Sequence, residues 1–321
     1  MPSVLVAGAS GYAGALAARL VHRHPELELT AVTSRSDAGR RLDDLYPQHR
    51  VPLVLDAFDL DEVGQVDAAI VAYPHGASAP VVAAMHERGI RVVDLSADFR
   101  LRDLATYEEW YVPHEAPELV EHAVYGLPEH YRDAIRGAHV VANPGCYPTA
   151  AILGLGPLKP YLGDVVIDAK SGVSGAGRAA TETTHFVSAD ENVTPYGVGR
   201  HRHTPEIEQE LGVQVQFTPH LVPLDQGEMT SCYVTLTEDV DVVALYEEAY
   251  ADEPFVELAS RPPGVRDVRA TNICRIHVHQ DDRTGRVLVF AVIDNLWKGA
   301  ASQAVQNLNL MLGLPETMGI S

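Results

Sequence analysis

The chain has 321 residues, of which 46% are hydrophobic and 21% are charged, and its formal net charge at pH 7 is -20. This length and composition predict a globular protein with room for two domains, each with its own core. The negative charge argues against non-specific nucleic-acid binding, which needs a basic surface. No apolar run approaches the roughly 18 residues of a membrane span, and no signal-peptide pattern precedes the first strand. We therefore expect a cytoplasmic protein without nucleic-acid or membrane partners.

The first part of the chain alternates short apolar strands with helix-like segments. This is the pattern of an α/β, Rossmann-type doubly wound parallel sheet. The expected strands are Ser3–Ala7, Glu28–Thr33, Asp67–Ala72, Arg91–Leu95 and His139–Ala142, and the expected helices are Tyr12–His24 and Ala79–Arg88.

Beyond residue 145 the pattern of expected elements changes: strands dominate, with few helices between them. An α+β domain with a largely antiparallel sheet is expected there. Its expected strands are Val165–Ala169, Val213–Thr218, Met229–Thr237, Ile273–His279 and Arg286–Asp294. A final helix is expected within Gly299 to Leu312, packed back on the first domain. The predicted division is residues 1–145 with 300–321 for cofactor binding, and residues 146–299 for catalysis, substrate binding and oligomerisation.

A glycine-rich loop follows the first expected strand. Its sequence, Gly8-Ala-Ser-Gly11-Tyr12-Ala-Gly14, places Ser10 where a dinucleotide-binding fingerprint has its second glycine. Between a strand and a helix, such a loop offers backbone N–H groups and a helix N-terminus to a pyrophosphate. Glycines also make ordinary turns, but this context predicts nucleotide binding.

The segment after the second expected strand bears on the choice of cofactor. An NAD site usually places Asp or Glu about 20 residues beyond the glycine loop, on the ribose 2′-hydroxyl. Arg35 stands there instead, between Ser34 and Ser36. A guanidinium can pair with a 2′-phosphate and the two hydroxyls can donate to it. The pattern predicts NADP(H); a polar turn without a ligand is the alternative.

Cys146 lies after the Pro144-Gly145 break that ends an apolar run, and a helix-compatible stretch, Ala150 to Leu155, follows it. This arrangement predicts a thiol at a helix N-terminus, where N–H groups and the helix dipole favour the thiolate. A catalytic nucleophile is one interpretation, and a buried structural cysteine is the other. The chain holds two further cysteines, Cys232 and Cys274, so three widely spaced thiols indicate neither a disulfide framework nor a zinc ribbon.

His201-Arg202-His203 can supply an acid or base, because the ordinary histidine pKa lies near 6.5. We assign proton transfer to His203 and substrate contact to His201. If the element is a strand, both imidazoles point the same way and Arg202 points the other way. A solvated surface turn is the alternative, and a zinc site formed with Cys146 is another, although no fourth ligand is evident and no metal is expected.

Further motifs occur in order along almost the whole chain. They are Gly8–Gly14, Pro74–Ser78, Asp94–Leu101, Tyr125–Glu129, Asn143–Thr149, Lys170–Arg178, His201–Gln209, Phe217–Pro223 and Asp294–Ala300. With these motifs the chain resembles the N-acetyl-γ-glutamyl-phosphate reductase family, relatives of aspartate-semialdehyde dehydrogenase. The resemblance implies NADPH-dependent reduction of an acyl phosphate to a semialdehyde in arginine biosynthesis, with release of inorganic phosphate.

The resemblance also implies roles for individual residues. Cys146 is the nucleophile that forms a thioester, and His201 and His203 serve catalysis and substrate binding. The cofactor contacts are Gly8, Ser10, Gly11, Tyr12, Gly14, Ser34, Arg35, Ser36, Pro74, Ser174, Gly175 and Asn295. A substrate with a carboxylate and a phosphate needs basic and hydroxyl donors, for which Arg100, Ser171, Ser174 and Arg178 are the candidates. The family further implies a homo-oligomer, a tetramer or a dimer.

Two departures from the family pattern stand out. Asp225-Gln226-Gly227 occupies a place where many members carry Arg-Gly, so we assign no anion site there, and Ser302 replaces a residue that is usually glycine. Alternative functions are the same chemistry on an aspartyl or aminoadipyl phosphate, or a non-catalytic NADP-binding regulator. The intact Cys146 and His203 argue against the regulator.

Overall fold

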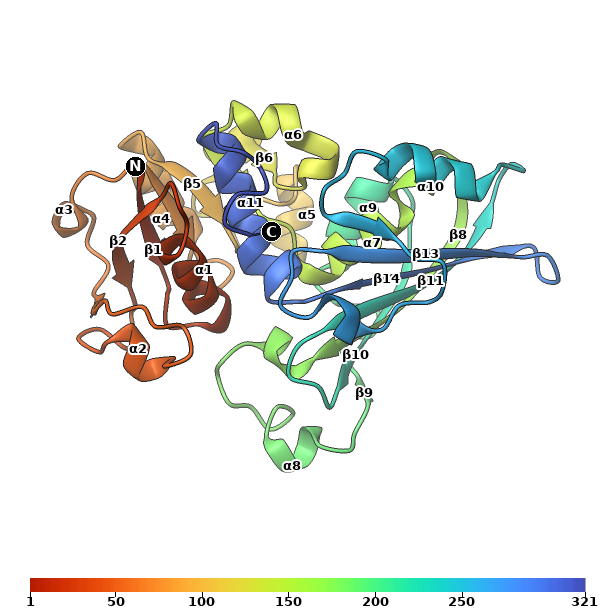
Figure 1. Ribbon diagram of the computed structural model, residues 1–321, viewed down its shortest axis with the longest axis horizontal. Coiled ribbons are helices and arrows are strands. Elements are labelled where there is room, and N and C mark those ends of the chain that lie inside the picture. The colour runs from red at the N-terminus through yellow and green to blue at the C-terminus, as the bar shows by residue number, and fades with distance from the viewer. Residues whose placement is uncertain (321) are drawn as a thin grey trace. The chain divides into compact units, whose positions relative to one another are not determined.

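The computed structural model describes residues 1–320, except the side chains of Glu62 and Val63. Two compact units make up the chain (Figure 1). Unit 1 comprises Met1–Pro144 and Ala300–Ser321, and unit 2 comprises Gly145–Gly299. Over the described part of the chain, no helix combines the length and apolar character needed to span a membrane.

Unit 1 is built on a seven-stranded sheet in the order β3-β2-β1-β4-β5-β7-β6, and every pairing in it is parallel. The strands are β1 (Ser3–Ala7), β2 (Glu28–Thr33), β3 (Leu55–Asp56), β4 (Ala68–Val71), β5 (Arg91–Asp94), β6 (Ala123–Tyr125) and β7 (Val140–Ala142). This confirms the predicted Rossmann-type sheet. The expectation missed β3 and β6, which have only two and three residues and are too short for a periodic pattern.

Both faces of this sheet are covered. Leu5 and Val71 on one face pack with Met85 of α4, while Val6 and Ile70, which alternate with them along the strands, are also fully buried. The helices of unit 1 are α1 (Tyr12–His22), α2 (Leu42–Leu45), α3 (Leu60–Val63), α4 (Ala79–Glu87), α5 (Leu104–Trp110), α6 (Pro128–Arg136) and α11 (Ser302–Met311), with a 3₁₀ turn at Pro117–His122. The expected final helix therefore begins at Ser302, after a π-helical turn at Trp297–Ala301.

Unit 2 holds a second seven-stranded sheet, in the order β12-β13-β14-β11-β8-β10-β9. Its strands are β8 (Leu162–Gly172), β9 (Thr194–Pro195), β10 (Gln216–Val222), β11 (Glu228–Leu236), β12 (Val256–Leu258), β13 (Cys274–Asp281) and β14 (Arg286–Ile293). Four pairings are antiparallel, whereas β8 with β10 and β12 with β13 are parallel. The predicted largely antiparallel sheet is confirmed.

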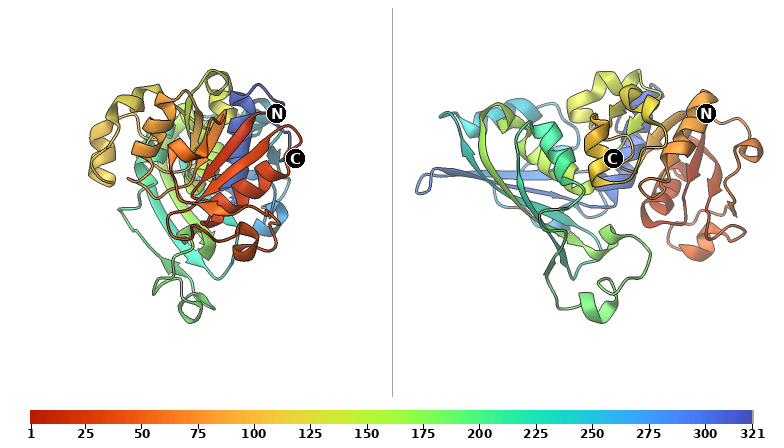
Figure 2. Two further views of the ribbon diagram at one scale, coloured as in Figure 1. Left: turned by 90° about the vertical axis from the view of Figure 1, so that its left-hand side faces the viewer. Right: turned by 180° about the vertical axis from the view of Figure 1, so that it is seen from behind.

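The helices of unit 2 are more numerous than expected. They are α7 (Cys146–Leu155), α8 (Phe186–Ala189), α9 (Thr204–Leu211) and α10 (Val242–Tyr250), with 3₁₀ turns at Gly156–Tyr161, Val173–Ala176 and Val265–Val268. Helix α9 ends where Gly212 adopts a left-handed conformation, so the strand expected over Val213–Thr218 begins only at Gln216. The two further views in Figure 2 show this unit's long strands from other sides.

Helix α7 is anchored at both ends within unit 2. At its C-terminal end, Tyr246 and Tyr250 of α10 donate their hydroxyls to the carbonyls of Gly154 and Leu153. A Cβ on Gly154 would lie 3.2 Å from Ala291 and 3.6 Å from Val289, so the helix lies directly on β14. The tyrosine bonds satisfy carbonyls that a helix end leaves without an intrahelical partner.

Candidate active site

Cys146 is the first residue of α7, and Gly145 is its N-cap. The helix thus begins earlier than the expected Ala150, because Pro148 is tolerated in a first turn, where no intrahelical N–H bond is needed. Thr149 closes this turn by donating both its N–H and its hydroxyl to the Gly145 carbonyl, each at 2.9 Å. Cys146 is partly exposed, whereas Cys232 and Cys274 are buried, and burial raises the pKa of Cys232 to about 12. Cys146 is therefore the thiol placed for reaction.

Two features of unit 2 hold the start of α7. The buried carboxylate of Glu206 accepts a hydrogen bond from the Gly145 N–H at 2.9 Å. On another side, the backbone of Gly299 passes so close that a Cβ there would lie 2.8 Å from the Cβ of Cys146. The glycine of the Asp294–Ala300 motif is thus required by its approach to the cysteine.

His201 and His203 lie in the turn that leads into α9, so the strand considered for them is wrong. Their rings are nevertheless neighbours, with centroids 4.9 Å apart. Both also pack edge-on against Tyr147, at 5.6 and 5.9 Å. The residue beside Cys146 therefore contacts both histidines.

The tautomer of His201 follows from its partner. The backbone N–H of His203 donates to Nδ1 of His201 at 3.1 Å, so the proton of the neutral ring lies on Nε2. Burial, helped by the charge of Arg202, lowers the pKa of His201 to about 4. At neutral pH His201 is a neutral hydrogen-bond donor, which leaves His203 as the candidate for proton transfer.

Aromatic residues complete this region, and the sequence did not single them out. Tyr196 donates its hydroxyl to that of Tyr147 at 3.2 Å, and its ring lies 5.3 Å from His201. The ring of Phe217 packs on Tyr147 and His201 at 5.3 and 5.2 Å. Burial raises the pKa of both tyrosines, which keeps them protonated. Tyr147 and Phe217 stand in motifs and were detectable, whereas Tyr196 stands in none.

The end of β8 and the segment after it contain further predicted site residues. Asn295 donates to the Ser174 hydroxyl at 3.0 Å and accepts from the Gly227 N–H at 2.8 Å, and Ser174 donates to the Asp225 carbonyl at 2.6 Å. These bonds give Ser174 and Asn295 a structural task. Gly175 lies where a Cβ would be 3.1 Å from the Ser171 hydroxyl, and the exposed Arg178 follows.

The glycine loop of unit 1 needs its glycines for steric reasons. Gly8 has a φ of +84°, and a Cβ there would lie 2.5 Å from the Ala72 carbonyl. A Cβ on Gly14 would lie 2.3 Å from the Gly8 carbonyl. Gly11 is the N-cap of α1 without a side-chain cap, so the first N–H groups of this helix face the place where a phosphate would bind. The loop fits a dinucleotide.

The segment after β2 lies against the glycine loop. Ser34 and Ser10 share a hydrogen bond between hydroxyls at 2.7 Å, and Ser34 also accepts from the Asp37 N–H at 3.1 Å. Ser36 donates to the Asp37 carboxylate at 2.7 Å. The guanidinium of the exposed Arg35 lies 4.8 Å from the ring centroid of Tyr73, next to Pro74. Arg35, Ser10 and Pro74 are thus held close together.

The Asp94–Leu101 motif acts mainly on backbone of unit 1. Asp98 accepts N–H bonds from Gly76, Ser78 and Ala79, at 2.7 to 3.2 Å. This orders the Pro74–Ser78 loop and the start of α4. Arg100 is buried and donates to the carbonyls of Asn143 and Leu95, both at 2.8 Å. Part of the Arg100 guanidinium is therefore committed to backbone, which does not favour its assignment as a substrate ligand.

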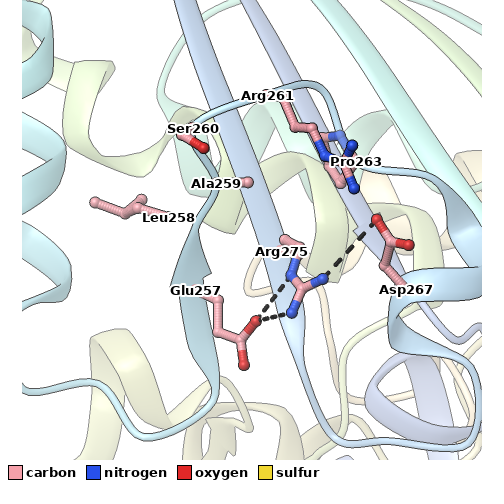
Figure 3. Close-up of a pocket in the computed structure, with 8 residues that line it drawn as sticks. All are labelled: Glu257, Leu258, Ala259, Ser260, Arg261, Pro263, Asp267 and Arg275. Atoms are coloured by element: carbon pink, nitrogen blue, oxygen red, sulfur yellow. Dashed lines mark hydrogen bonds and ion pairs between the residues drawn. The ribbon is translucent and has the colours of Figure 1, made fainter.

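A separate pocket of unit 2 contains none of the predicted site residues. It is lined by Glu257, Leu258, Ala259, Ser260, Arg261, Pro263, Asp267 and Arg275 (Figure 3). Arg275 lies between Glu257, to which it donates at 2.8 Å, and Asp267, 3.8 Å away.

Among the described side chains, no group of three or more His, Cys, Asp or Glu is arranged as a metal site. Cys146, His201 and His203 do not form such a group either.

Family models match most of the chain. Residues 3–138 match the semialdehyde dehydrogenase, NAD binding domain, and residues 146–295 match the semialdehyde dehydrogenase, dimerisation domain. The chain therefore carries a domain of a type that binds a nicotinamide cofactor.

Similar proteins carry one name. The N-acetyl-gamma-glutamyl-phosphate reductase of Moorella thermoacetica is 51% identical over 336 residues, which cover 98% of this chain and 96% of the relative. The same-named proteins of Desulforudis audaxviator and Halorhodospira halophila are 49% and 50% identical, and each comparison covers 100% of this chain and 98% of the relative.

Solved structures of low sequence identity share the fold. Aspartate semialdehyde dehydrogenase II from Vibrio cholerae, complexed with ASA, has a TM-score of 0.73 at 19% identity, over 98% of each chain. Aspartate semialdehyde dehydrogenase with NADP from Candida albicans has a TM-score of 0.74 at 14% identity, over 97% of this chain and 98% of the other. The chain belongs to the N-acetyl-γ-glutamyl-phosphate reductase family, a family of oxidoreductases with the two semialdehyde dehydrogenase domains.

Proposed function

We propose that this protein reduces N-acetyl-γ-glutamyl phosphate to N-acetylglutamate semialdehyde with NADPH and releases inorganic phosphate, a step of arginine biosynthesis. The observation that carries the proposal is the partly exposed Cys146 at the first position of α7, with His201 and His203 packed on its neighbour Tyr147. The names of the similar proteins supply the substrate.

The chemistry of unit 2 is nucleophilic. The Cys146 thiolate attacks the acyl carbon, a C–S bond forms, and the C–O bond to phosphate breaks with its electron pair on the phosphate. NADPH held by the glycine loop would supply the hydride that reduces the thioester, and the former carbonyl oxygen would then carry the negative charge. His203 donates a proton to this oxygen and takes it back when the C–S bond breaks, which releases the aldehyde and restores the thiolate. The Nε2–H of His201 donates to an anionic group of the substrate.

In this proposal unit 1, which includes α11, is the NADP-binding domain, and unit 2 is the catalytic and oligomerisation domain. Backbone N–H groups of the Gly8–Gly14 loop hold the pyrophosphate, with Ser10 and Tyr12 beside it. Arg35 pairs with the 2′-phosphate and selects NADP over NAD, assisted by Ser34 and Ser36. Pro74 and, from unit 2, Ser174, Gly175 and Asn295 complete the cofactor contacts, although Ser174 and Asn295 also hold each other.

Substrate anions are assigned to Ser171, Arg178 and His201, with Arg100 the weakest candidate because its bonds go to backbone carbonyls. The position of Ser171 supports its assignment as a substrate ligand. It is buried near the end of β8, in the row of residues that faces α7.

A homo-oligomer belongs to the proposal too. One face of the unit 2 sheet is covered by α7. On the opposite face Val166, Tyr233 and Leu288 are partly exposed and pair across the strands, and the partly exposed Phe290 pairs with Ser231. An apolar sheet face of this kind is typical of an interface, and the matching family model is that of a dimerisation domain.

The test is a spectrophotometric assay of NADP reduction with N-acetylglutamate semialdehyde and phosphate. We expect sustained turnover only when phosphate or arsenate is present, because the thioester must be released by attack of that anion. A greater kcat/KM with aspartate semialdehyde, or with the aminoadipate homologue, would mean that this compound is the substrate in place of N-acetylglutamate semialdehyde. Cofactor binding without turnover on any of them would support the regulator instead.

A further inference from the structure

Glu228 is a buried carboxyl group that the mechanism above does not use. It is the first residue of β11, and the strand register places it opposite Ser171 of β8 and Ile293 of β14. Along β11 it alternates in phase with Thr230 and Cys232, which are buried on the face that α7 covers. The carboxyl of Glu228 therefore lies on the α7 side of the sheet.

The course of α7 brings Cys146 to the same row. Near its C-terminal end, Gly154 lies over Ala291 and Val289. At its N-terminal end, Cys146 packs against Gly299, where an added Cβ would also meet Ile293 at 3.2 Å. The helix thus runs along β14, and its first residue, Cys146, lies at the row formed by Glu228, Ser171 and Ile293.

The surroundings of Glu228 are closed to solvent. Its relative exposure is 0%, and among the described residues neither carboxyl oxygen has a hydrogen-bond partner of ordinary geometry. The Cys146 thiol and the Ser171 hydroxyl nonetheless lie near enough to interact with it. Burial raises the pKa of Glu228 to about 8, and the charge of Asp294 acts in the same direction. At neutral pH the carboxyl is protonated and is a hydrogen-bond donor.

Other titratable groups of unit 2 lie near this pair. Burial raises the pKa of Tyr147 and of Tyr196 far above the ordinary tyrosine value, and the negative charge of Glu228 acts in the same direction. Asp294 accepts backbone N–H bonds from Ala270 and Leu296 at 2.8 and 2.9 Å. Burial raises the pKa of Asp294, and His203 packs on Tyr147, so substitutions at Glu228 are needed to assign an inflection to its carboxyl.

We propose that Glu228 is a positioning residue that donates its carboxyl O–H to the sulfur of Cys146 and so favours the thiolate at neutral pH. The two groups then lose their protons in two coupled steps, the first mainly from the thiol and the second from the carboxyl. The same bond stabilises the thiolate when it leaves the tetrahedral intermediate. The inference rests on the proposed function only in taking Cys146 as the nucleophile.

The experiment is the rate of Cys146 alkylation by iodoacetamide from pH 5 to 11, in the full chain without substrate or cofactor, with the modified peptide identified by mass spectrometry. We expect at least two inflections for the unmodified protein, one from the thiol and one from Glu228. Glu228→Gln keeps a donor but does not titrate, so it should lose the inflection of Glu228 and react at pH 7 within about three-fold of the original rate. Glu228→Leu loses both properties and should react about ten-fold more slowly at pH 7, which corresponds to roughly one pKa unit.

The matched control is Glu210→Gln, which removes another buried carboxyl of unit 2 and should keep both inflections. A single inflection at the ordinary thiol pKa in the unmodified protein would overturn the proposal even if the variants failed to fold. A faster reaction of Glu228→Leu at pH 7 would also overturn it, because the carboxyl would then be ionised and oppose the thiolate. Since no substrate is present, these results stand apart from any failure of the reductase assay.

Discussion

At the scale of single residues, Cys146 differs from the other two cysteines in exposure and in its place at a helix start. We expect Cys146→Ala to abolish turnover, because no other side chain at the start of α7 can form the acyl intermediate. NADPH binding, measured by fluorescence titration, should be retained, since the glycine loop belongs to unit 1. Cys232→Ala is the matched control and should keep its kcat at moderate temperature. More than a few per cent of residual activity in Cys146→Ala would remove covalent catalysis.

The two histidines should differ in their effect on the pH profile. His203→Asn should lower kcat by about 10²–10⁴-fold and remove an inflection between pH 5 and 8. His201→Gln should keep that inflection, because burial lowers the pKa of His201 to about 4 and the ring stays neutral over this range. The measurement is kcat and kcat/KM from pH 5 to 9. Loss of the inflection in the His201 variant alone would exchange the two roles.

Burial of His201 also has a consequence for stability. Its folded pKa of about 4 lies below the ordinary 6.5, so the unfolded chain binds a proton first as the pH falls. The stability associated with the neutral ring is present above about pH 6.5 and is lost as the pH falls from there towards 4. Thermal unfolding should show a smaller loss of Tm over this range in His201→Asn than in the unmodified protein. Equal losses would mean that the ring is not shielded from solvent.

Arg35 is the residue on which the choice of cofactor depends. Loss of a charge-assisted contact costs about 1.5–3 kcal/mol, or roughly 10- to 100-fold in affinity. Arg35→Ala should weaken NADPH binding by that factor and leave NADH binding nearly unchanged. Arg41→Ala is a suitable control, since Arg41 is bound to Asp43 at 2.7 Å. Equal weakening of both cofactors in Arg35→Ala would indicate a structural role for its stacking on Tyr73.

At the scale of elements, the start of α1 depends on how closely two backbone segments approach. A Cβ on Gly14 would overlap the Gly8 carbonyl at 2.3 Å, whereas a Cβ on Gly11 would meet its nearest atom at 3.7 Å. Gly14→Ala should therefore lower the free energy of unfolding by about 1–3 kcal/mol and weaken cofactor binding. Gly11→Ala should leave stability nearly unchanged. Chemical denaturation of the two variants checks this, and equal stabilities would contradict the steric account.

At the scale of the whole molecule, the exposed apolar face of the unit 2 sheet is the place where we expect a second copy. Leu288→Glu on this face should halve the mass found by analytical ultracentrifugation, while Val243→Glu, at a position of α10 that is 56% exposed, should not. Each copy carries a formal charge of -20, so association should weaken at low ionic strength. A monomer under all salt conditions would leave this face without a partner.

The sequence by itself determined the features that depend on neighbouring residues. Short apolar runs between helical patterns were enough to predict the parallel sheet, because both faces of β1 and β4 are buried and their residues read as continuous apolar segments. The glycine loop and the cysteine before α7 were also readable, since a strand, a tight turn and a helix start follow one another within a few residues. Very short edge strands such as β9 and β12 were not, because two or three residues hold no period.

Only the tertiary structure decided which distant residues meet at Cys146. Glu228 comes from a strand, Glu206 from α9 and Tyr196 from the segment between β9 and α9, and no local pattern relates any of them to the cysteine. Their proximity follows from the pairing of β11 with β8 and β14 and from the packing of α7 on that face. Burial there also sets the protonation of His201 and Glu228, because desolvation disfavours charge and is a property of the packed site rather than of the residue type.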